Sequence, residues 1–190
     1  QEVKLGNLIF SNNRPFTLIG GINVIEEEDF TFNCAQIYKK VCDYLSINFV
    51  FKASYDKANR SSINSYRGPG IQKGLKILKD IKKELNIPII SDVHTPEEAL
   101  AASEVLDIIQ LPAFLARQTD LIKAIAKTDK VINIKKPQFL SPYQVKNIID
   151  KFINFGNNKI LVCERGHSFG YDNLVVDMLS FGLIKEYCHN

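Results

Sequence analysis

The sequence lacks the cysteine and histidine spacings that bind structural metals or carry out thiol redox chemistry. Its four cysteines, Cys34, Cys42, Cys163 and Cys188, include no CxxC pair and no Cys/His ligand spacing. Cys34 and Cys42 fall on one predicted helix but are too far apart along it to bond to each other. The pattern therefore indicates reduced thiols, as expected of a cytoplasmic protein.

Long hydrophobic runs and a strong charge of either sign are also absent. No run approaches the ~18 apolar residues that cross a membrane, and residues 1–10 contain no apolar segment typical of a signal peptide. The net charge of +3 is too small to indicate nucleic-acid binding by itself, and the cations form no stripe along one helix. We therefore expect neither a membrane nor a nucleic acid as a partner.

What the sequence does contain is a repeated alternation of strand and helix patterns. Strands are predicted at residues 17–23, 48–53, 88–93, 107–111, 131–134 and 160–163. Helices are predicted at residues 28–47, 70–86, 118–128 and 173–187, from Pro96 with Thr95 as its cap, and from Pro142 to Phe155 with Ser141 as its cap. A small hairpin, Val3–Leu5 and Leu8–Phe10, is predicted before them.

Repeated βα units predict a parallel sheet with helices outside it. No GxGxxG follows the first strand, which argues against a dinucleotide-binding fold. A TIM (β/α)8 barrel has eight units and about 250 residues, whereas six units can be counted in these 190 residues. We therefore expect an α/β protein, with residues 1–190 forming a single, incomplete TIM-barrel domain behind an N-terminal hairpin.

Polar side chains follow each predicted strand where it ends. They are Asn23 and Glu26, Lys52 and Ser54, Asp92 and His94, Gln110, Lys135 and Lys136, and Glu164 and Arg165. Active sites of βα barrels lie at the carboxyl ends of the strands, so this repeated pattern predicts a site there. Helix caps and surface ion pairs use the same residue types, and for His94 alone a hydrogen-bonded loop histidine is an equally good interpretation.

The predicted site is basic. Residues 51–70, FKASYDKANRSSINSYRGPG, contain four cations and a single acid, Asp56. Such a charge run is often only a solvated surface loop, but its place after a buried strand favours an anion-binding loop. Convergence of Lys52, Lys57, Lys135 and Arg165 would require a ligand with two or more negative charges. Lysine at a strand end also fits a Schiff-base aldolase, with Lys135 beside Lys136, although that chemistry needs no long basic loop.

Seven segments together resemble one enzyme family. The segments are GGINVIE, FKASYDKANRSS, SYRGPG, SDVHTP, DIIQLPAFLARQTDL, INIKKPQF and RGHSFGYDNLVVDM. They resemble 3-deoxy-D-manno-octulosonate 8-phosphate synthase, collinearly over nearly the whole chain. The resemblance implies a TIM barrel, usually a homotetramer, that condenses phosphoenolpyruvate with D-arabinose 5-phosphate and releases phosphate. The product of this transferase feeds lipopolysaccharide biosynthesis.

The resemblance also implies residue roles. Lys135 and Arg165 would hold the phosphate of phosphoenolpyruvate with Gln110 and the N–H of Ala113, while Lys52, Ser54 and Lys57 would face its carboxylate. Asn59, Arg60 and Ser61 would bind arabinose 5-phosphate, with Arg60 supplied by a neighbouring subunit, and Asp92 would lie near the reacting sugar. The residues expected to be catalytic are Asn23, Lys52, Lys57, Asp92 and Lys135.

Position 23 decides whether a metal cofactor is expected. Metal-dependent relatives have a cysteine there, whose thiolate binds a divalent metal together with later His, Glu and Asp ligands. This sequence has Asn23, a poor and neutral ligand. We therefore expect an enzyme without a metal or other cofactor.

The family continues for about two more βα units beyond the position of Asn190. We therefore expect the 190 residues alone to be poorly stable, because of two exposed sheet edges, and nearly inactive. Two alternatives remain open. One is a sibling synthase that uses erythrose 4-phosphate, against which the KANRSS run argues. The other is a truncated or degenerate barrel that binds anions without catalysis.

Overall fold

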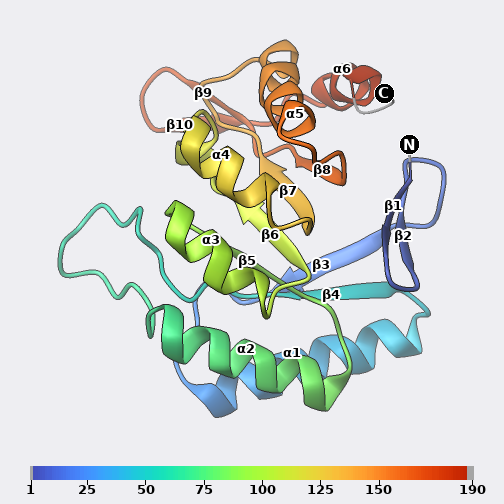
Figure 1. The fold of residues 1–190 in the computed structure, drawn as a ribbon, viewed down its shortest axis with the longest axis vertical. Helices are drawn as coiled ribbons and strands as arrows, with labels where there is room; N and C mark the ends of the chain where they lie inside the picture. Colours follow the sequence, from blue (N-terminus) through green and yellow to red (C-terminus); the bar gives the residue numbers. More distant parts are fainter. Residues whose placement is uncertain (1, 188–190) are drawn as a thin grey trace.

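Six short runs rich in isoleucine and valine form one curled parallel sheet, seen in the computed structural model, which describes residues 2–187 (Figure 1). The strands are β3 (Thr17–Gly21), β4 (Asn48–Lys52), β5 (Ile89–Asp92), β6 (Ile108–Leu111), β7 (Val131–Lys135) and β8 (Ile160–Cys163). Their order in the sheet is their order in the chain, and every neighbouring pair is parallel. The sheet is therefore a partial TIM-type barrel, as predicted.

Helices cover the outer face of this sheet (Figure 1). They are α1 (Glu28–Tyr44), α2 (Ile71–Leu85), α3 (Pro96–Ser103), α4 (Thr119–Ala126) and α5 (Val145–Asn154). The remaining helical elements are α6 (Ser180–Tyr187) and the short 3-10 turns η1 (Ala113–Leu115) and η2 (Pro142–Gln144). Both predicted caps are confirmed. The Thr95 hydroxyl accepts the N–H of Glu98 at 3.2 Å, and Ser141 forms a capping box with Gln144. The first turn after Ser141 is 3-10 rather than α.

Side chains alternate between the two faces of each strand, and this alternation divides the buried apolar residues into an outer cluster under the helices and an inner cluster inside the curl. Ile89 of β5 packs outward against the helices, whereas its neighbour Ile90 packs inside the curl. The predicted hairpin of β1 (Val3–Leu5) and β2 (Leu8–Phe10) is confirmed. Val3 is buried in the same inner cluster as Ile90 and Ile108. The hairpin therefore fills the inside of the curl with apolar groups.

The helix predicted at residues 173–187 is wrong in its first part. Asn173–Val175 is a strand, β10, which pairs antiparallel with β9 (His167–Phe169), and the helix begins only at Ser180. The turn between the strands contains left-handed residues, Gly170 at φ 63° and Asp172 at φ 60°. A left-handed turn of this kind reverses the chain into a hairpin and excludes a helix that starts at Asn173.

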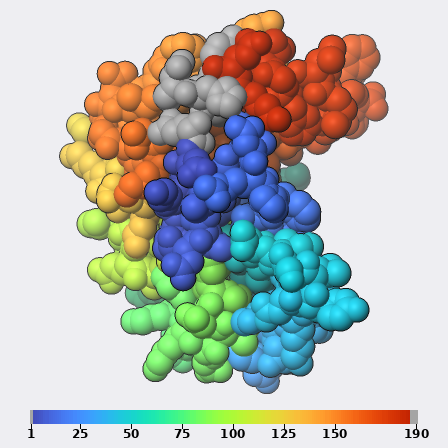
Figure 2. Space-filling model, turned by 90° about the vertical axis from the view of Figure 1, so that its right-hand side faces the viewer, coloured from blue at the N-terminus to red at the C-terminus, as the bar shows by residue number. Residues whose placement is uncertain are grey.

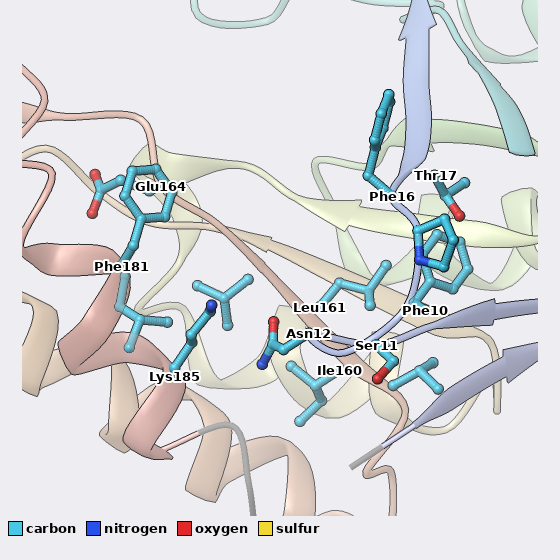
Figure 3. A pocket seen from close by; sticks show the side chains of 14 residues that line it. Phe10, Ser11, Asn12, Phe16, Thr17, Ile160, Leu161, Glu164, Phe181 and Lys185 are labelled. Atoms are coloured by element: carbon cyan, nitrogen blue, oxygen red, sulfur yellow. The ribbon is translucent and has the colours of Figure 1, made fainter. Parts of the chain in front are cut away.

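The end strands β3 and β8 each have only one sheet neighbour among residues 2–187. A cavity of about 300 Å³ lies between them. In Figure 3, Phe16 and Thr17 of the β3 side face Phe181 and Lys185 of α6 across this space. Figure 2 shows the N-terminal residues (blue) lying between the C-terminal part (red) and the region of α1 and β4 (light blue and cyan). No helix of the described part of the chain is long and apolar enough to cross a membrane.

Candidate active site

The inner face of the sheet changes from apolar to polar along each strand. Val50, Ile90 and Ile108 belong to the inner cluster. Two residues further along the same strands come Lys52, Asp92 and Gln110, which share that face because strand side chains repeat every two residues. The polar side chains therefore gather at the carboxyl edge of the sheet, as the strand-end pattern predicted.

A cavity of about 270 Å³ opens at this edge. Seven of the predicted site residues line it, namely Lys57, Asn59, Asp92, Gln110, Ala113, Lys135 and Arg165, together with His94 and the apolar groups of Pro112, Phe114 and Leu115. Five predicted site residues do not line it: Asn23, Lys52, Ser54, Arg60 and Ser61. Lys57 of the basic loop, Lys135 at the end of β7 and Arg165 of the loop after β8 thus converge on one small space.

Asp92 lines the cavity and also contacts Ser54 and Lys52, which lie behind it. The Ser54 hydroxyl donates a short hydrogen bond to Asp92 Oδ1. Lys52 Nζ lies 3.1 Å from Ser54 Oγ and 3.7 Å from Asp92 Oδ1. Burial alone would raise the pKa of the Asp92 carboxyl, but the hydrogen bond with His94 and the charges of Lys52 and Lys57 hold that pKa far below its usual range. Asp92 is therefore an anion at neutral pH.

His94 lies between two carboxylates. Its Nε2 is 3.4 Å from Asp92 Oδ2, and its Nδ1 is 3.0 Å from Glu98 Oε2. Burial lowers the pKa of the imidazole, but the hydrogen bonds with Asp92 and Glu98 outweigh burial and raise it to about 9. Glu98 also accepts a hydrogen bond from the buried Tyr55 hydroxyl at 2.8 Å. His94 is therefore a cation at neutral pH and lines the cavity in that state.

The base of the basic loop is fixed by main-chain hydrogen bonds. The Lys57 N–H donates to Arg67 O at 2.6 Å, and the Gly70 N–H donates to Tyr55 O at 3.1 Å. The Arg67 guanidinium pairs with Asp56 and is largely exposed. Burial, together with the nearby Lys52 charge, lowers the pKa of Lys57 to about 8. Within this loop, Arg67 is therefore paired with Asp56, whereas the Lys57 side chain lines the cavity.

The tip of the same loop is exposed. Asn59, Arg60 and Ser61 all lie on the surface, and Arg60 Nε donates to Tyr66 O at 3.1 Å. Asn59 alone of these three residues lines the cavity. In this single chain, the Arg60 side chain is therefore turned to its own loop and away from the cavity.

Two cavity residues have partners that the sequence did not single out. Asn133 Nδ2 donates to Gln110 Oε1 at 3.3 Å, and Arg165 Nη1 donates to Gln138 Oε1 at 2.7 Å. Asn133 precedes Lys135 by two residues on β7, so the strand alternation carries a signal for it. Gln138 lies in an irregular loop, where no periodic signal exists.

Lys136 was predicted to accompany Lys135 at the site, and this is wrong. Its side chain is fully buried against Glu164 and does not line the cavity. The reason is the alternation along the chain, which directs Lys135 inward and its neighbour to the other side. Lys136 therefore cannot serve as a second lysine of a Schiff-base site.

Asn23 lies just beyond the end of β3 and is exposed. It does not line the cavity. Within residues 2–187, no three His, Cys, Asp or Glu side chains come close enough together to hold a metal ion. The expected role of Asn23 stays a prediction.

The cavity, with three basic side chains beside an ionised Asp92, suits a ligand that carries several negative charges. A family model described as the DAHP synthetase I family matches residues 2–190. The chain belongs to this family. Membership agrees with the curled parallel sheet and with a cavity at the carboxyl ends of its strands.

Curated relatives match nearly the whole chain. It is 63% identical over 188 residues to the 2-dehydro-3-deoxyphosphooctonate aldolase of Parasynechococcus marenigrum (strain WH8102), covering 99% of the chain and 66% of that protein. It is 62% identical over 190 residues to the protein of that name from Prochlorococcus marinus (strain MIT 9313), covering 100% of the chain and 67% of that protein. The protein of that name from Edwardsiella ictaluri (strain 93-146) is 56% identical over 187 residues, covering 98% of the chain and 66% of that protein. The chain thus spans about two thirds of the length of these relatives.

Proposed function

We propose that this chain is the larger part of an enzyme that condenses phosphoenolpyruvate with D-arabinose 5-phosphate to give 3-deoxy-D-manno-octulosonate 8-phosphate and phosphate. One observation carries the proposal: Lys57, Lys135 and Arg165 line a single cavity with Asp92 and His94. The relatives' name, 2-dehydro-3-deoxyphosphooctonate aldolase, supports the same product. We propose the cytoplasm as the compartment, because the cysteines of the described part of the chain are free thiols.

The proposed roles follow the distribution of charge. Lys135 and Arg165, with Gln110 and the Ala113 N–H, would hold the phosphate of phosphoenolpyruvate, because an Arg–phosphate pair forms two parallel hydrogen bonds. Lys57 would face the carboxylate. Lys52 and Ser54 would support that end from behind, through Asp92.

Arabinose 5-phosphate would enter from the loop tip. Asn59 lines the cavity beside Lys57, and Arg60 and Ser61 lie further out on the surface. We propose that Arg60 turns to the sugar phosphate of a neighbouring subunit in a homotetramer. Asp92 would then lie near the reacting sugar.

In the proposed reaction, carbon 3 of phosphoenolpyruvate attacks the sugar aldehyde, whose oxygen takes a proton. Water adds its hydroxyl at carbon 2, and phosphate leaves with cleavage of the C–O bond. Positioning of two reactants can supply roughly 7–11 kcal/mol of such a barrier. The fixed cations of the cavity would stabilise the developing negative charge.

Binding and turnover can be tested separately. Calorimetric titration of the 190-residue chain with phosphoenolpyruvate tests the cavity. Phosphate release with arabinose 5-phosphate or erythrose 4-phosphate as the second substrate tests the reaction. We expect binding by the 190 residues, and turnover with arabinose 5-phosphate only in a protein of the relatives' full length. Turnover with erythrose 4-phosphate instead would identify the sibling synthase, and binding without turnover at full length would identify an anion-binding barrel.

A further inference from the structure

Lys136 is a fully buried lysine that touches no solvent and does not line the cavity. Its ammonium contacts three main-chain carbonyl oxygens: Pro137 O at 3.1 Å, Leu140 O at 3.3 Å and Gly166 O at 3.1 Å. It also lies 3.3 Å from Glu164 Oε1. Two of these carbonyls belong to the loop after β7, whereas Glu164 and Gly166 belong to the loop after β8.

Glu164, the acidic partner of Lys136, makes further hydrogen bonds within the loop after β8 and to α6. Only 1% of its side chain is exposed. Its Oε1 accepts the Gly166 N–H at 2.6 Å, and its Oε2 accepts the Ser180 hydroxyl of α6 at 2.8 Å. Burial would raise the pKa of Glu164, but its hydrogen bonds with Gly166 and Ser180 and the charge of Lys136 lower it. The carboxylate thus ties the β8 loop both to the β7 loop and to α6.

The two cations proposed for the phosphate lie directly beside this pair in the chain. Lys135 precedes Lys136, and Arg165 stands between Glu164 and Gly166, both of which Lys136 contacts. Arg165 also donates to Gln138 in the β7 loop. The Lys136 ammonium and the Glu164 carboxylate therefore bridge the two loops directly beside Lys135 and Arg165. The same loops are also joined by main-chain bonds from Lys136 N–H to Cys163 O at 2.9 Å and from Ser168 N–H to Gln138 O at 3.0 Å.

A buried ion pair of this kind is a poor way to gain stability. Well-packed apolar residues of similar volume are often equally stabilising or more so, because they avoid the cost of removing two charges from water. A lysine here does what an apolar side chain cannot do, which is to bind carbonyl oxygens of two loops at once. This favours a role in geometry over a role in stability alone.

We infer that Lys136 and Glu164 are positioning residues that hold Lys135 and Arg165 at the separation that one phosphate group requires. The inference rests on the proposed function for the identity of the ligand, phosphoenolpyruvate. It requires only a phosphate group in the cavity and can therefore be tested with inorganic phosphate as well.

The test compares Lys136→Met with the double variant Lys136→Met/Glu164→Leu by calorimetric titration of the 190-residue chain with phosphoenolpyruvate, inorganic phosphate and arabinose 5-phosphate. The single variant leaves Glu164 buried without its partner, so it loses stability. The double variant leaves no uncompensated charge, and its thermal unfolding shows whether the fold persists. A matched control, Phe152→Leu in α5, enlarges a buried outer-core site without touching either loop.

We expect the double variant to bind phosphoenolpyruvate and inorganic phosphate at least about tenfold more weakly, with arabinose 5-phosphate affinity changed less than about twofold. The control should lose thermal stability with both affinities unchanged. A folded double variant with wild-type affinity for phosphoenolpyruvate and phosphate would overturn the inference and leave the proposed function standing. If the wild-type chain binds phosphate but not phosphoenolpyruvate, the proposed function fails, while the phosphate titration still decides the inference. A wild-type chain that binds neither overturns both.

Discussion

Glu98 Oε2 accepts two hydrogen bonds from a single residue, His94: one from the main-chain N–H at 2.8 Å and one from ring Nδ1 at 3.0 Å. Glu98 lies in the first turn of α3, and His94 directly precedes the Thr95 cap of that helix. The imidazole is therefore fixed against the helix, with Nε2 toward Asp92. A ring held in this way between two carboxylates keeps its proton at neutral pH.

This geometry predicts a stability that depends on pH through His94. The pKa of His94 is raised from 6.5 to about 9 in the folded chain. The folded state therefore binds the proton more tightly, and the stabilisation is complete below pH 6.5 and lost as the pH rises through 9. Urea unfolding of the wild-type chain and of His94→Gln should differ by up to about 3 kcal/mol at low pH and converge at high pH. A difference that stays constant across this range would contradict the prediction.

The lowered pKa of Lys57 predicts that phosphoenolpyruvate binding depends on pH. Its pKa is lowered to about 8, so the free chain loses this cation above that pH. Phosphoenolpyruvate affinity should fall about tenfold from neutral pH to one unit above the pKa. In the Lys57→Arg variant the cation persists, and the decline should be much smaller. Calorimetric titrations at both pH values measure the effect, and an equal decline in wild type and variant would place its origin elsewhere.

The elements that the sequence predicted well are those with a clear period. The strands predicted at residues 88–93 and 107–111 correspond to β5 and β6. The alternation of side chains along a strand would also have placed Lys135 and Lys136 on opposite sides of the sheet, with only Lys135 toward the cavity. The helix predicted over residues 173–187 is confirmed from Ser180 onward, whereas its first part is a strand, because a short apolar run fits a strand as well as a helix.

Contacts between loops were beyond the reach of sequence patterns. Lys136 meets Glu164 only because of the path that the chain takes after β7 and after β8. Arg165 meets Gln138 for the same reason. Such irregular segments have no period, and their partners are set by the packing of the finished fold.

The presence of asparagine at position 23 predicts that enzymatic activity resists chelators. An amide side chain is a poor replacement for the thiolate that the family resemblance implies at this position in metal-dependent members. Activity of a protein of the relatives' full length should be unchanged after treatment with a strong chelator and dialysis. Loss of activity that an added divalent metal restores would contradict the prediction.

Arg60 predicts a link between subunit assembly and sugar-phosphate binding. Its guanidinium is exposed and turned to Tyr66 O in the single chain, and we propose that it serves a neighbouring subunit. Arg60→Ala should weaken arabinose 5-phosphate binding about 10- to 100-fold, from a charge-assisted bond of about 1.5–3 kcal/mol. Phosphoenolpyruvate affinity should stay the same. Arg14→Ala, which removes an exposed guanidinium paired with Glu2, is the matched control. A monomeric form of the wild type that keeps full sugar-phosphate affinity would contradict the role.

The close packing at Gly21, directly beside the site, predicts that no larger residue fits at this position. It pairs with Lys52 across β3 and β4, and a Cβ added to it would lie 2.1 Å from the Lys52 carbonyl oxygen. Its φ of +153° adds backbone strain for any other residue. Gly156 has a φ of +93° but nothing within 4 Å of an added Cβ, so Gly156→Ala measures strain without the contact. Gly21→Ala should therefore cost about 1–3 kcal/mol more than Gly156→Ala in urea unfolding. It should also weaken phosphoenolpyruvate binding, because the strand that carries Lys52 must move. Equal costs for the two substitutions would show that β3 and β4 accommodate the added Cβ, and an unchanged phosphoenolpyruvate affinity would show that the site does not depend on this contact.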